Sequence, residues 1–388
     1  MLVPKLRFKE FNNEWIKLKL KNISTELQYG MGAAAIDYDG KNKYIRITDI
    51  DDISSQYINN PVSPDGKLED KYLVNENDIL FARTGASVGK TYLYNIKDGK
   101  LYFAGFLIRA HIKDNYNALF VFEQTKLNSY KKWVKLTSAR SGQPGINSIE
   151  YGNYEFSITT LEEQEKIANF LLLLDKKIEL QQKKIDVLKM YKKGLINKLL
   201  TETIGTKKSL YEIIGEYTEK SSINNEYDVI SSTTKGLFLQ KEYFKKDISS
   251  EDNTGYKILK KYQIVLSPQN LWMGNINFND KYEIGIVSPS YKIYDIKEGY
   301  NKNFINILMS TPKAIYEYSL ASEQGASIVR RNLNVELFEQ ISFNIPEEEI
   351  QNKIDKYVSA ISNKLEIAVQ KYEELNILKK GLLQQMFI

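Results

Sequence analysis

The side chains that could do chemistry in this sequence favour recognition over bond breaking. The chain has no cysteine and one histidine, His111. Thiolate metal sites and disulfides are therefore ruled out, and most histidine-centred acid–base schemes are removed. Arginine, lysine, serine, threonine, asparagine and glutamine instead recur in stretches that read as turns. Because these residue types bind the phosphates and base edges of nucleic acids, the turns predict contacts with nucleic acid.

A set of turn residues in each half of the chain is the candidate for these contacts. Arginine pairs bidentately with guanine and asparagine or glutamine with adenine, whereas lysine, serine and threonine favour phosphates. Each residue alone could be a turn residue or a solvated charge, but recurrence in both halves favours the set. Trp272, beside the second set, could be a core aromatic or a contact. The candidate DNA-binding residues are Arg46, Thr48, Arg83, Thr84, Ser87, Lys90, Arg140, Gln143, Ser231, Thr233, Lys235, Gln269, Asn270, Ser327, Arg330 and Arg331.

The run from Gly85 to Thr91 has the glycines, lysine and threonine of a phosphate-binding loop. The first glycine of that motif would fall at Thr84, one residue early. The following residues, Tyr92 to Ile96, read as a strand, so no helix N-terminus would face a phosphate. The sequence favours a glycine turn between two strands over a nucleotide site.

A tight acidic group and the spacing of the prolines bear on catalysis. Asp65, Glu69 and Asp70 lie too close in sequence to share a metal from paired strands, which predicts a solvated turn and no metal site. None of the eight prolines is adjacent to another, whereas common amino-methyltransferases carry a Pro-Pro catalytic loop. We therefore predict that the chain is not an enzyme by itself and binds no cofactor of its own.

The stretch from Leu161 to Leu200 is the element that must position the loops. Its core positions are spaced alternately by four and three, which is the a/d pattern of a coiled coil, with polar exceptions at Gln181 and Lys192. A helix of this length runs roughly 60 Å at ~1.5 Å per residue, and its narrow apolar stripe needs a partner helix. The predicted core positions are Ile167, Leu171, Leu174, Ile178, Gln181, Ile185, Leu188, Lys192, Leu195 and Leu199.

The partner helix is predicted in the same chain, because adding 187 to each number gives a second stripe of the same phase. Gln164 recurs as Gln351, and the run Lys192-Lys193-Gly194-Leu195 recurs as Lys379-Lys380-Gly381-Leu382. We interpret this as a tandem duplication of about half the chain. The second set of core positions is Ile354, Val358, Ile361, Leu365, Ala368, Tyr372, Leu375, Lys379, Leu382 and Met386.

The blocks that precede the two helices read as β-rich, with β-branched and aromatic runs between turn residues. Strands are expected at Lys43 to Ile47, Asp78 to Ala82, Thr91 to Ile96 and Leu101 to Ile112, and helical stretches at Asn117 to Leu136 and Phe304 to Leu320. The predicted fold is α+β: two β-rich domains separated by two long helices that form an intramolecular antiparallel coiled coil, in a pseudo-twofold tandem repeat. The predicted segments are residues 1–158 and 204–345 for the domains and 159–203 and 346–388 for the helices.

Charge and hydropathy bound the partners and the compartment. A net charge of +5 and a pI near 8.8 permit a polyanionic partner without requiring one. Lys5, Arg7, Lys9 and Glu10 interrupt any apolar leader, and no apolar run approaches ~18 residues. We therefore expect a cytoplasmic protein without a membrane segment.

Four runs of sequence carry a resemblance to one family. They are Val3 to Phe8 with Phe11 and Trp15, Asp78 to Ala86, Leu161-Glu162-Glu163-Gln164, and Gly285 to Tyr291. Together with the order of domain, helix, domain, helix, they make the whole chain similar to the DNA specificity subunits of type I restriction-modification enzymes. The second helix departs from the first, because Pro346 to Gln351 replaces the earlier Leu-Glu-Glu-Gln run while keeping the glutamine.

The resemblance implies a DNA-binding subunit of a DNA methylation and restriction complex. Each globular domain would be a target-recognition domain that reads one half of a bipartite double-stranded target, and the helix pair would set the gap. The implied partners are modification (methyltransferase) subunits, expected to number two, which use S-adenosylmethionine, and restriction subunits, which use ATP and Mg.

Two questions about binding stay open at this level. Leu382, Leu383 and Phe387 at the end of the second helix could dock the modification subunits or pack onto a neighbouring domain. The chain as a whole could instead be a coiled-coil scaffold protein with two protein-binding heads. Salt would discriminate these functions, because DNA binding weakens steeply with added salt.

Overall fold

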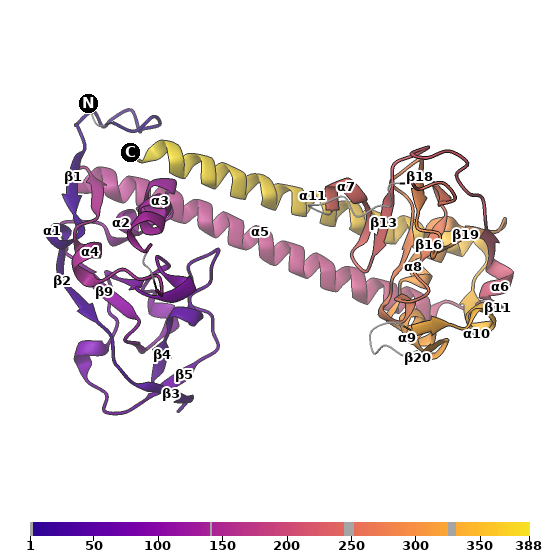
Figure 1. Ribbon diagram of the computed structural model, residues 1–388, viewed down its shortest axis with the longest axis horizontal. Helices are drawn as coiled ribbons and strands as arrows, with labels where there is room; N and C mark the ends of the chain where they lie inside the picture. Colours follow the sequence, from indigo (N-terminus) through magenta and orange to yellow (C-terminus); the bar gives the residue numbers. More distant parts are fainter. Residues whose placement is uncertain (1–2, 140–141, 244–251, 325–330) are drawn as a thin grey trace. The chain divides into compact units, whose positions relative to one another are not determined.

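The chain folds into two compact units, each of which contains segments of both long helices. The computed structural model describes residues 3–139, 142–243, 252–324 and 331–388. One unit is formed by Met1–Lys183 with Val369–Ile388, and the other by Lys184–Ala368. Figure 1 shows the chain by its colours along the sequence.

The first unit is built on a four-stranded antiparallel sheet of strand order β2-β9-β6-β7. Two antiparallel pairs (β1 with β10, β3 with β5) and one parallel pair (β4 with β8) add to it. The strands are β1 Ile16–Lys19, β2 Ser24–Tyr29, β3 Ala34–Asp37, β4 Lys43–Ile45, β5 Val62–Asp65, β6 Asp78–Ala82, β7 Thr91–Leu93, β8 Leu101–Phe103, β9 Leu107–Ile112 and β10 Glu155–Ile158. The helices are α1 Leu20–Ile23, α2 Ala118–Gln124, α3 Asn128–Thr137 and α4 Ser148–Gly152.

The second unit repeats this architecture with its own four-stranded antiparallel sheet, of order β12-β19-β16-β17. Further antiparallel pairs are β11 with β22, β13 with β14, β15 with β18 and β20 with β21. The strands are β11 Thr206–Ser209, β12 Ile214–Tyr217, β13 Ile230–Thr233, β14 Gly236–Leu239, β15 Lys257–Lys260, β16 Ile264–Leu266, β17 Ile276–Phe278, β18 Ile284–Val287, β19 Lys292–Ile296, β20 Ser322–Gln324, β21 Arg331–Leu333 and β22 Ser342–Ile345. The helices are α6 Leu210–Ile213, α7 Gln240–Tyr243, α8 Lys302–Met309, α9 Pro312–Leu320 and α10 Val335–Gln340.

The expected elements are present, but several are shorter than their sequence patterns. All five residues of β6 are buried, as its continuous apolar run predicts for a central strand. The run from Leu101 to Ile112 forms two strands, because a turn at Gly105 brings the backbone against Met31, whose carbonyl accepts a hydrogen bond from the Gly105 N–H at 2.8 Å. The stretch from Phe304 to Leu320 likewise divides into α8 and α9, where Thr311 caps the second helix through a bond from the Ala314 N–H.

The two long helices, α5 (Leu161–Glu202) and α11 (Glu348–Met386), pack together as an antiparallel pair (Figure 1). The first unit combines the start of α5 with the end of α11, and the second unit combines the end of α5 with the start of α11. None of the predicted core positions on either helix is exposed. The heptad reading and the fold class are therefore confirmed.

A buried glutamine joins each long helix to the domain of its unit, at equivalent places in the two repeats. Gln164 accepts a hydrogen bond from the Asn117 N–H at 3.0 Å and donates to the Thr159 carbonyl at 2.7 Å. Gln351 accepts from the Asn301 N–H at 2.9 Å and donates to the Pro346 carbonyl at 2.8 Å. The two asparagines cap α2 and α8, so one amide fixes the start of a long helix against the start of a short one.

The end of α11 belongs to the core of the first unit. The Phe387 ring lies 6.2 Å from the Trp15 ring and 5.1 Å from the Phe120 ring, measured between centroids. Leu383 and Phe387 are only 6% and 4% exposed, and Leu382 packs against the same core. The expectation that these residues dock a partner is wrong for Leu383 and Phe387, because buried side chains offer no docking surface. The alternative of packing onto a neighbouring domain is what the structure shows.

We expect Phe387→Ala to lower the free energy of unfolding of the first unit by about 3–5 kcal/mol, because it opens a cavity among aromatic rings. Thermal or denaturant unfolding of the full chain measures this. Ile377→Ala on the same helix is the matched control: Ile377 is 72% exposed, and we expect a change within about 0.5 kcal/mol. Equal shifts for the two variants would contradict the packing described here.

Candidate nucleic-acid interface

Arg83 follows β6 directly and lies near two exposed aromatic rings. Its guanidinium carbon is 5.2 Å from the Tyr29 ring centroid and 5.8 Å from that of Phe106. Its Nε donates to the Gly105 carbonyl at 3.0 Å. Tyr29 and Phe106 remain 41% and 56% exposed. An arginine held on aromatic faces keeps its planar N–H edge oriented, which suits bidentate pairing with guanine.

The loop after β6 is joined to the loop that carries Gln143. The Gly85 N–H donates to the Pro144 carbonyl and the Ile146 N–H to the Arg83 carbonyl, both at 2.9 Å. Gly85 has a φ of +70°, which favours glycine, and a Cβ built there would lie 3.2 Å from Gln143 Nε2. The structure thus brings Arg83, Thr84 and Gln143 together at the end of β6.

The run that resembles a phosphate-binding loop is a turn between antiparallel strands. Gly85–Ser87 forms one turn of 3₁₀ helix, and β7 follows it. No helix N-terminus follows the glycines, so the preferred reading as a glycine turn is confirmed. Ser87 is half-buried in this turn.

Two candidate cations of the first unit have partners within the fold. Arg46 binds the buried Asp49 through two hydrogen bonds, at 2.8 and 2.9 Å, and this hydrogen bonding raises the pKa of its guanidinium. Lys90 donates to the Ile50 carbonyl at 3.3 Å and pairs with Asp52 at 2.7 Å. Lys90 therefore ties the turn after β6 to the loop that carries Arg46 and the exposed Thr48.

The second unit places an arginine on an aromatic ring in the same way. Trp272 lies in the 3₁₀ turn Leu271–Met273 after β16, and the guanidinium carbon of Arg331 is 4.4 Å from its ring centroid. The Arg331 N–H donates to the Gln269 carbonyl at 3.2 Å. Trp272 is half-buried, whereas its neighbour Leu271 is fully buried. Leu271 is therefore the core residue of this turn, and Trp272 supports Arg331.

Asparagine amides connect the β13–β14 hairpin to Asn275, whose backbone N–H donates to the Asn270 carbonyl at 3.2 Å. The buried Ser232 hydroxyl donates to Asn275 Oδ1 at 2.9 Å, and Asn277 Nδ2 donates to the Thr233 carbonyl, also at 2.9 Å. The Thr233 hydroxyl accepts a hydrogen bond from the Lys235 N–H at 3.0 Å. The Lys235 side chain is exposed at the tip of the hairpin. The hairpin of Ser231, Thr233 and Lys235 and the loop of Gln269 and Asn270 therefore lie together. Arg140, Ser327 and Arg330 lie outside the described residues.

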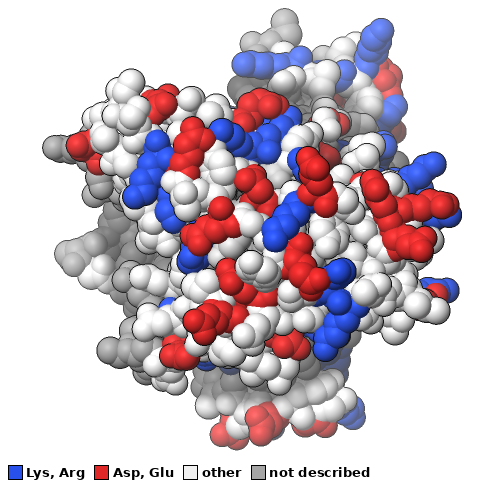
Figure 2. Space-filling model, turned by 90° about the vertical axis from the view of Figure 1, so that its right-hand side faces the viewer, with Lys and Arg blue, Asp and Glu red and all other residues white. Residues whose placement is uncertain are grey.

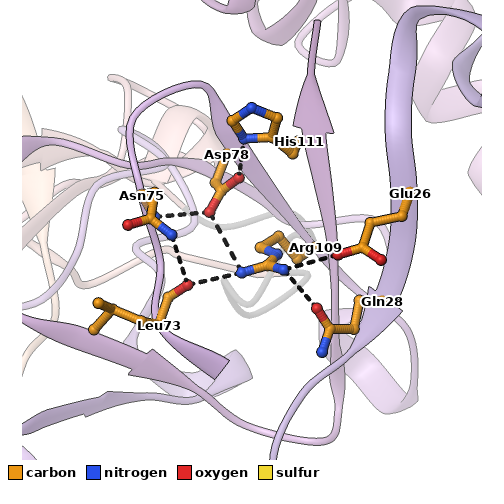
Figure 3. A network of polar contacts seen from close by, with 7 residues as sticks. All are labelled: Glu26, Gln28, Leu73, Asn75, Asp78, Arg109 and His111. Carbon is orange, nitrogen blue, oxygen red and sulfur yellow. Dashed lines mark hydrogen bonds and ion pairs between the residues drawn. The ribbon is translucent and has the colours of Figure 1, made fainter. Parts of the chain in front are cut away.

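A polar network around the buried Asp78 and Arg109, which sequence reasoning missed, joins strands of the first sheet (Figure 3). Asp78 on β6 lies opposite His111 on β9 and bonds its Nδ1 at 2.8 Å. Arg109 donates to the Leu73 carbonyl at 2.8 Å and to the side chains of Glu26 and Gln28 on β2. Burial raises the pKa of Asp78, while its hydrogen bonds oppose that shift. The network joins the three strands whose ends carry Tyr29, Arg83 and Phe106. The signal in the sequence that could have pointed to this network was the presence of a single histidine, His111, and of Asp78 at the start of a buried strand.

The sequence from residue 12 to residue 190 matches the model of one family, described as the type I restriction modification DNA specificity domain. That stretch of the chain is a type I DNA specificity domain. The chain is 24% identical over 415 residues to the putative type I restriction enzyme MjaX specificity subunit of Methanocaldococcus jannaschii, covering 96% of this chain and 93% of that relative. It is also 28% identical to the MjaVIII specificity subunit of the same organism over 210 residues, which cover 53% of this chain and about half (48%) of that relative.

Solved structures share the fold of this chain at low sequence identity. The S subunit of the type I restriction-modification system from M. genitalium superposes with a TM-score of 0.60 at 17% identity and covers 100% of this chain and 99% of its own. A chain of a type I restriction-modification system, from work on complex assembly and conformational transition, gives a TM-score of 0.56 at 12% identity, with 96% and 97% coverage. These matches support the two-unit architecture.

One face of the second unit carries charges of both signs (Figure 2). On the face of the second unit seen in Figure 2, lysine and arginine side chains alternate with aspartate and glutamate. Among the described residues, no group of three or more histidines and carboxylates could hold a metal ion. No helix within the described ranges combines the length and the apolarity needed to cross a bilayer.

Proposed function

We propose that this chain selects the DNA sequence on which a type I restriction-modification complex acts. The observation that carries the proposal is that both units, built on the same sheet order, hold an arginine over an aromatic face beside a loop with glutamine. Stacking reduces the freedom of the guanidinium before it meets a base edge, so less entropy is lost on binding. Each unit would read one half of a bipartite double-stranded target.

The remaining candidates divide between reading and holding. Arg83, Gln143, Gln269, Asn270 and Arg331 are proposed to contact base edges, since Arg suits guanine and Asn or Gln suits adenine. Phosphate contacts are proposed for the hydroxyl and lysine side chains of the set, Thr48, Thr84, Ser87, Lys90, Ser231, Thr233 and Lys235. Because Arg46 is paired with Asp49, we propose that it contacts the DNA phosphate backbone and not a base edge.

The helix pair is proposed to set the gap between the half-sites and to dock the modification subunits. Leu173, Leu180 and Val187 of α5 recur every seven residues and are 67%, 56% and 57% exposed. An exposed apolar stripe with heptad spacing fits an amphipathic helix of a partner. This stripe replaces the end of α11 as the proposed contact. The complex would obtain S-adenosylmethionine and ATP with Mg through its modification and restriction subunits.

Arg83→Ala should weaken binding to the specific DNA about 5- to 150-fold, the equivalent of losing about 1–3 kcal/mol of base contact. Fluorescence anisotropy with specific and scrambled duplexes at several salt concentrations measures this in the assembled complex. Arg83→Lys is the matched control, because it retains the charge but lacks the planar fork. It should keep most of the salt-dependent affinity and lose discrimination at one base pair.

If the Arg83→Ala variant discriminates specific from scrambled DNA as well as the wild type does, Arg83 does not contact a base edge. Binding that does not respond to salt would count against DNA recognition altogether and in favour of a scaffold with protein-binding heads.

A further inference from the structure

Lys192 occupies a core position of the helix pair in the second unit without an ion pair among the described residues. It is half-buried, and burial lowers the pKa of its ammonium group. A lysine at an a or d position reduces coiled-coil stability unless something compensates for its desolvation. Its retention therefore needs an explanation.

The repeat-equivalent lysine in the first unit is neutralised from within the chain. Lys379 forms an ion pair with Asp175 of α5 and lies 4.0 Å from Glu123 of α2. Glu123 is fully buried and also pairs with Lys126 at 2.5 Å. Two lysines and two carboxylates thus fill the space between the long helices and α2.

The second unit has lost all three of the other charges. The offset of 187 that relates Lys192 to Lys379 places Ser362 where Asp175 stands. The helix caps Asn117 and Asn301 relate α2 to α8 by an offset of 184, which places Ile307 at Glu123 and Ser310 at Lys126. Only the lysine of the charged group remains.

An open groove of about 810 Å³ lies at this place in the second unit. Its lining includes Lys192, Ile307, Ser310 and Ser362, the residues that the repeat alignment points to. The charged residues of the lining are Lys189, Lys192, Lys193, Asp280 and Glu366, so three positive and two negative charges leave one positive charge. Val358, Leu365 and Pro312 supply apolar walls.

We propose that this groove binds the carboxylate of an aspartate or glutamate side chain of a modification subunit, with Lys192 as its ion-pair partner. The proposal rests on the proposed function and adds a specific contact to it. The repeat-equivalent lysine shows that carboxylates are the groups this position accepts. Asp280 and Glu366 would repel a phosphate monoester, which carries nearly two negative charges, more strongly than a single carboxylate. The equivalent place in the first unit is occupied by the paired side chains of Lys379, Asp175, Glu123 and Lys126. Only the second unit would therefore offer this contact to a modification subunit.

The test measures binding of the modification subunit to the full-length chain by calorimetric titration. Lys192→Met should weaken binding about tenfold, because a partner carboxylate would be left in the groove without its cation. Ser362→Asp should weaken it by a similar factor, because the new carboxylate would occupy Lys192 as Asp175 occupies Lys379. Ser362→Asn and the exposed Lys198→Met are the matched controls and should bind as the wild type does.

Charge reversal identifies the partner residue. Lys192→Glu should abolish most binding, and one aspartate or glutamate of the modification subunit changed to lysine should restore it at least in part. Wild-type binding by both Lys192→Met and Ser362→Asp would overturn the proposal. So would weakened DNA binding with unchanged subunit binding, which would assign the groove to a backbone phosphate. Failure of the proposed function is distinguishable, because the wild-type chain itself would then bind neither the modification subunit nor specific DNA, and this proposal would fall with it.

Discussion

Exchanging the first unit, residues 1–183 together with 369–388, for that of another type I specificity subunit is expected to change one half of the DNA target and leave the other half unchanged. The physical reason is that each unit has its own sheet, core and candidate reading loops. Mapping methylated adenines in cells that express the hybrid with its modification subunit measures the result. A hybrid whose target changes in both halves would refute independent reading.

The control for this exchange replaces residues 1–155 alone. That hybrid keeps the native Leu383, Met386 and Phe387, which pack with Trp15 and Phe120 in the core of the first unit. The core residues of a foreign domain would not be complementary in shape to these side chains, and such mismatches typically lower the free energy of unfolding by about 1–3 kcal/mol. We therefore expect a lower melting temperature for the short exchange than for the full one.

Inserting one heptad into both long helices is expected to widen the gap between the half-sites while leaving both half-sites unchanged. Seven residues placed after Lys183 in α5 and before Val369 in α11 add about 10.5 Å to each helix and preserve the phase of the core positions. At ~3.4 Å per base pair, the gap should grow by about one to three base pairs, allowing for the twist of the DNA. Methylation mapping again gives the answer.

A heptad inserted into α5 only is the matched control. It would leave seven residues of one helix without partners and put the core positions on either side out of register. We expect this variant to lose the pairing of the two long helices, and not to recognise a target with a wider gap between its half-sites. If the double insertion keeps the original gap, the helices are not the element that sets it.

The coiled coil could be predicted residue by residue because its burial follows a local period. Core positions repeat along each helix whatever lies beyond them, and the duplicated phase supplied the partner. The strands could be predicted by type but not by length. Leu101 to Ile112 is apolar throughout, yet it breaks at Gly105 because the chain near Met31, more than seventy residues earlier, approaches the backbone there.

The residue types of the candidate site could be predicted from the sequence, but the side chains that each candidate residue contacts could not. Turn composition indicated Arg46, Arg83 and Arg331 equally. The structure separates them: Arg46 forms an ion pair with Asp49, whereas the guanidinium groups of Arg83 and Arg331 lie over aromatic rings. Tyr29 ends β2 and Phe106 lies in the turn before β9, and no local pattern relates their rings to Arg83.

The sequence by itself determined the duplicated layout, the phase of both long helices and the family, because these depend on periodicity and on identities at a constant offset. Only the tertiary structure decided which of the repeated residues have the same environment. Gln164 and Gln351 make the same bonds, since both asparagine caps are retained. Lys379 is paired with carboxylates, whereas Lys192 forms no ion pair within the described part of the chain, since Ser362 and Ile307 stand where the first unit has Asp175 and Glu123. Burial of a side chain depends on whatever the fold brings against it, and for Phe387 that is a domain more than two hundred residues away in the chain.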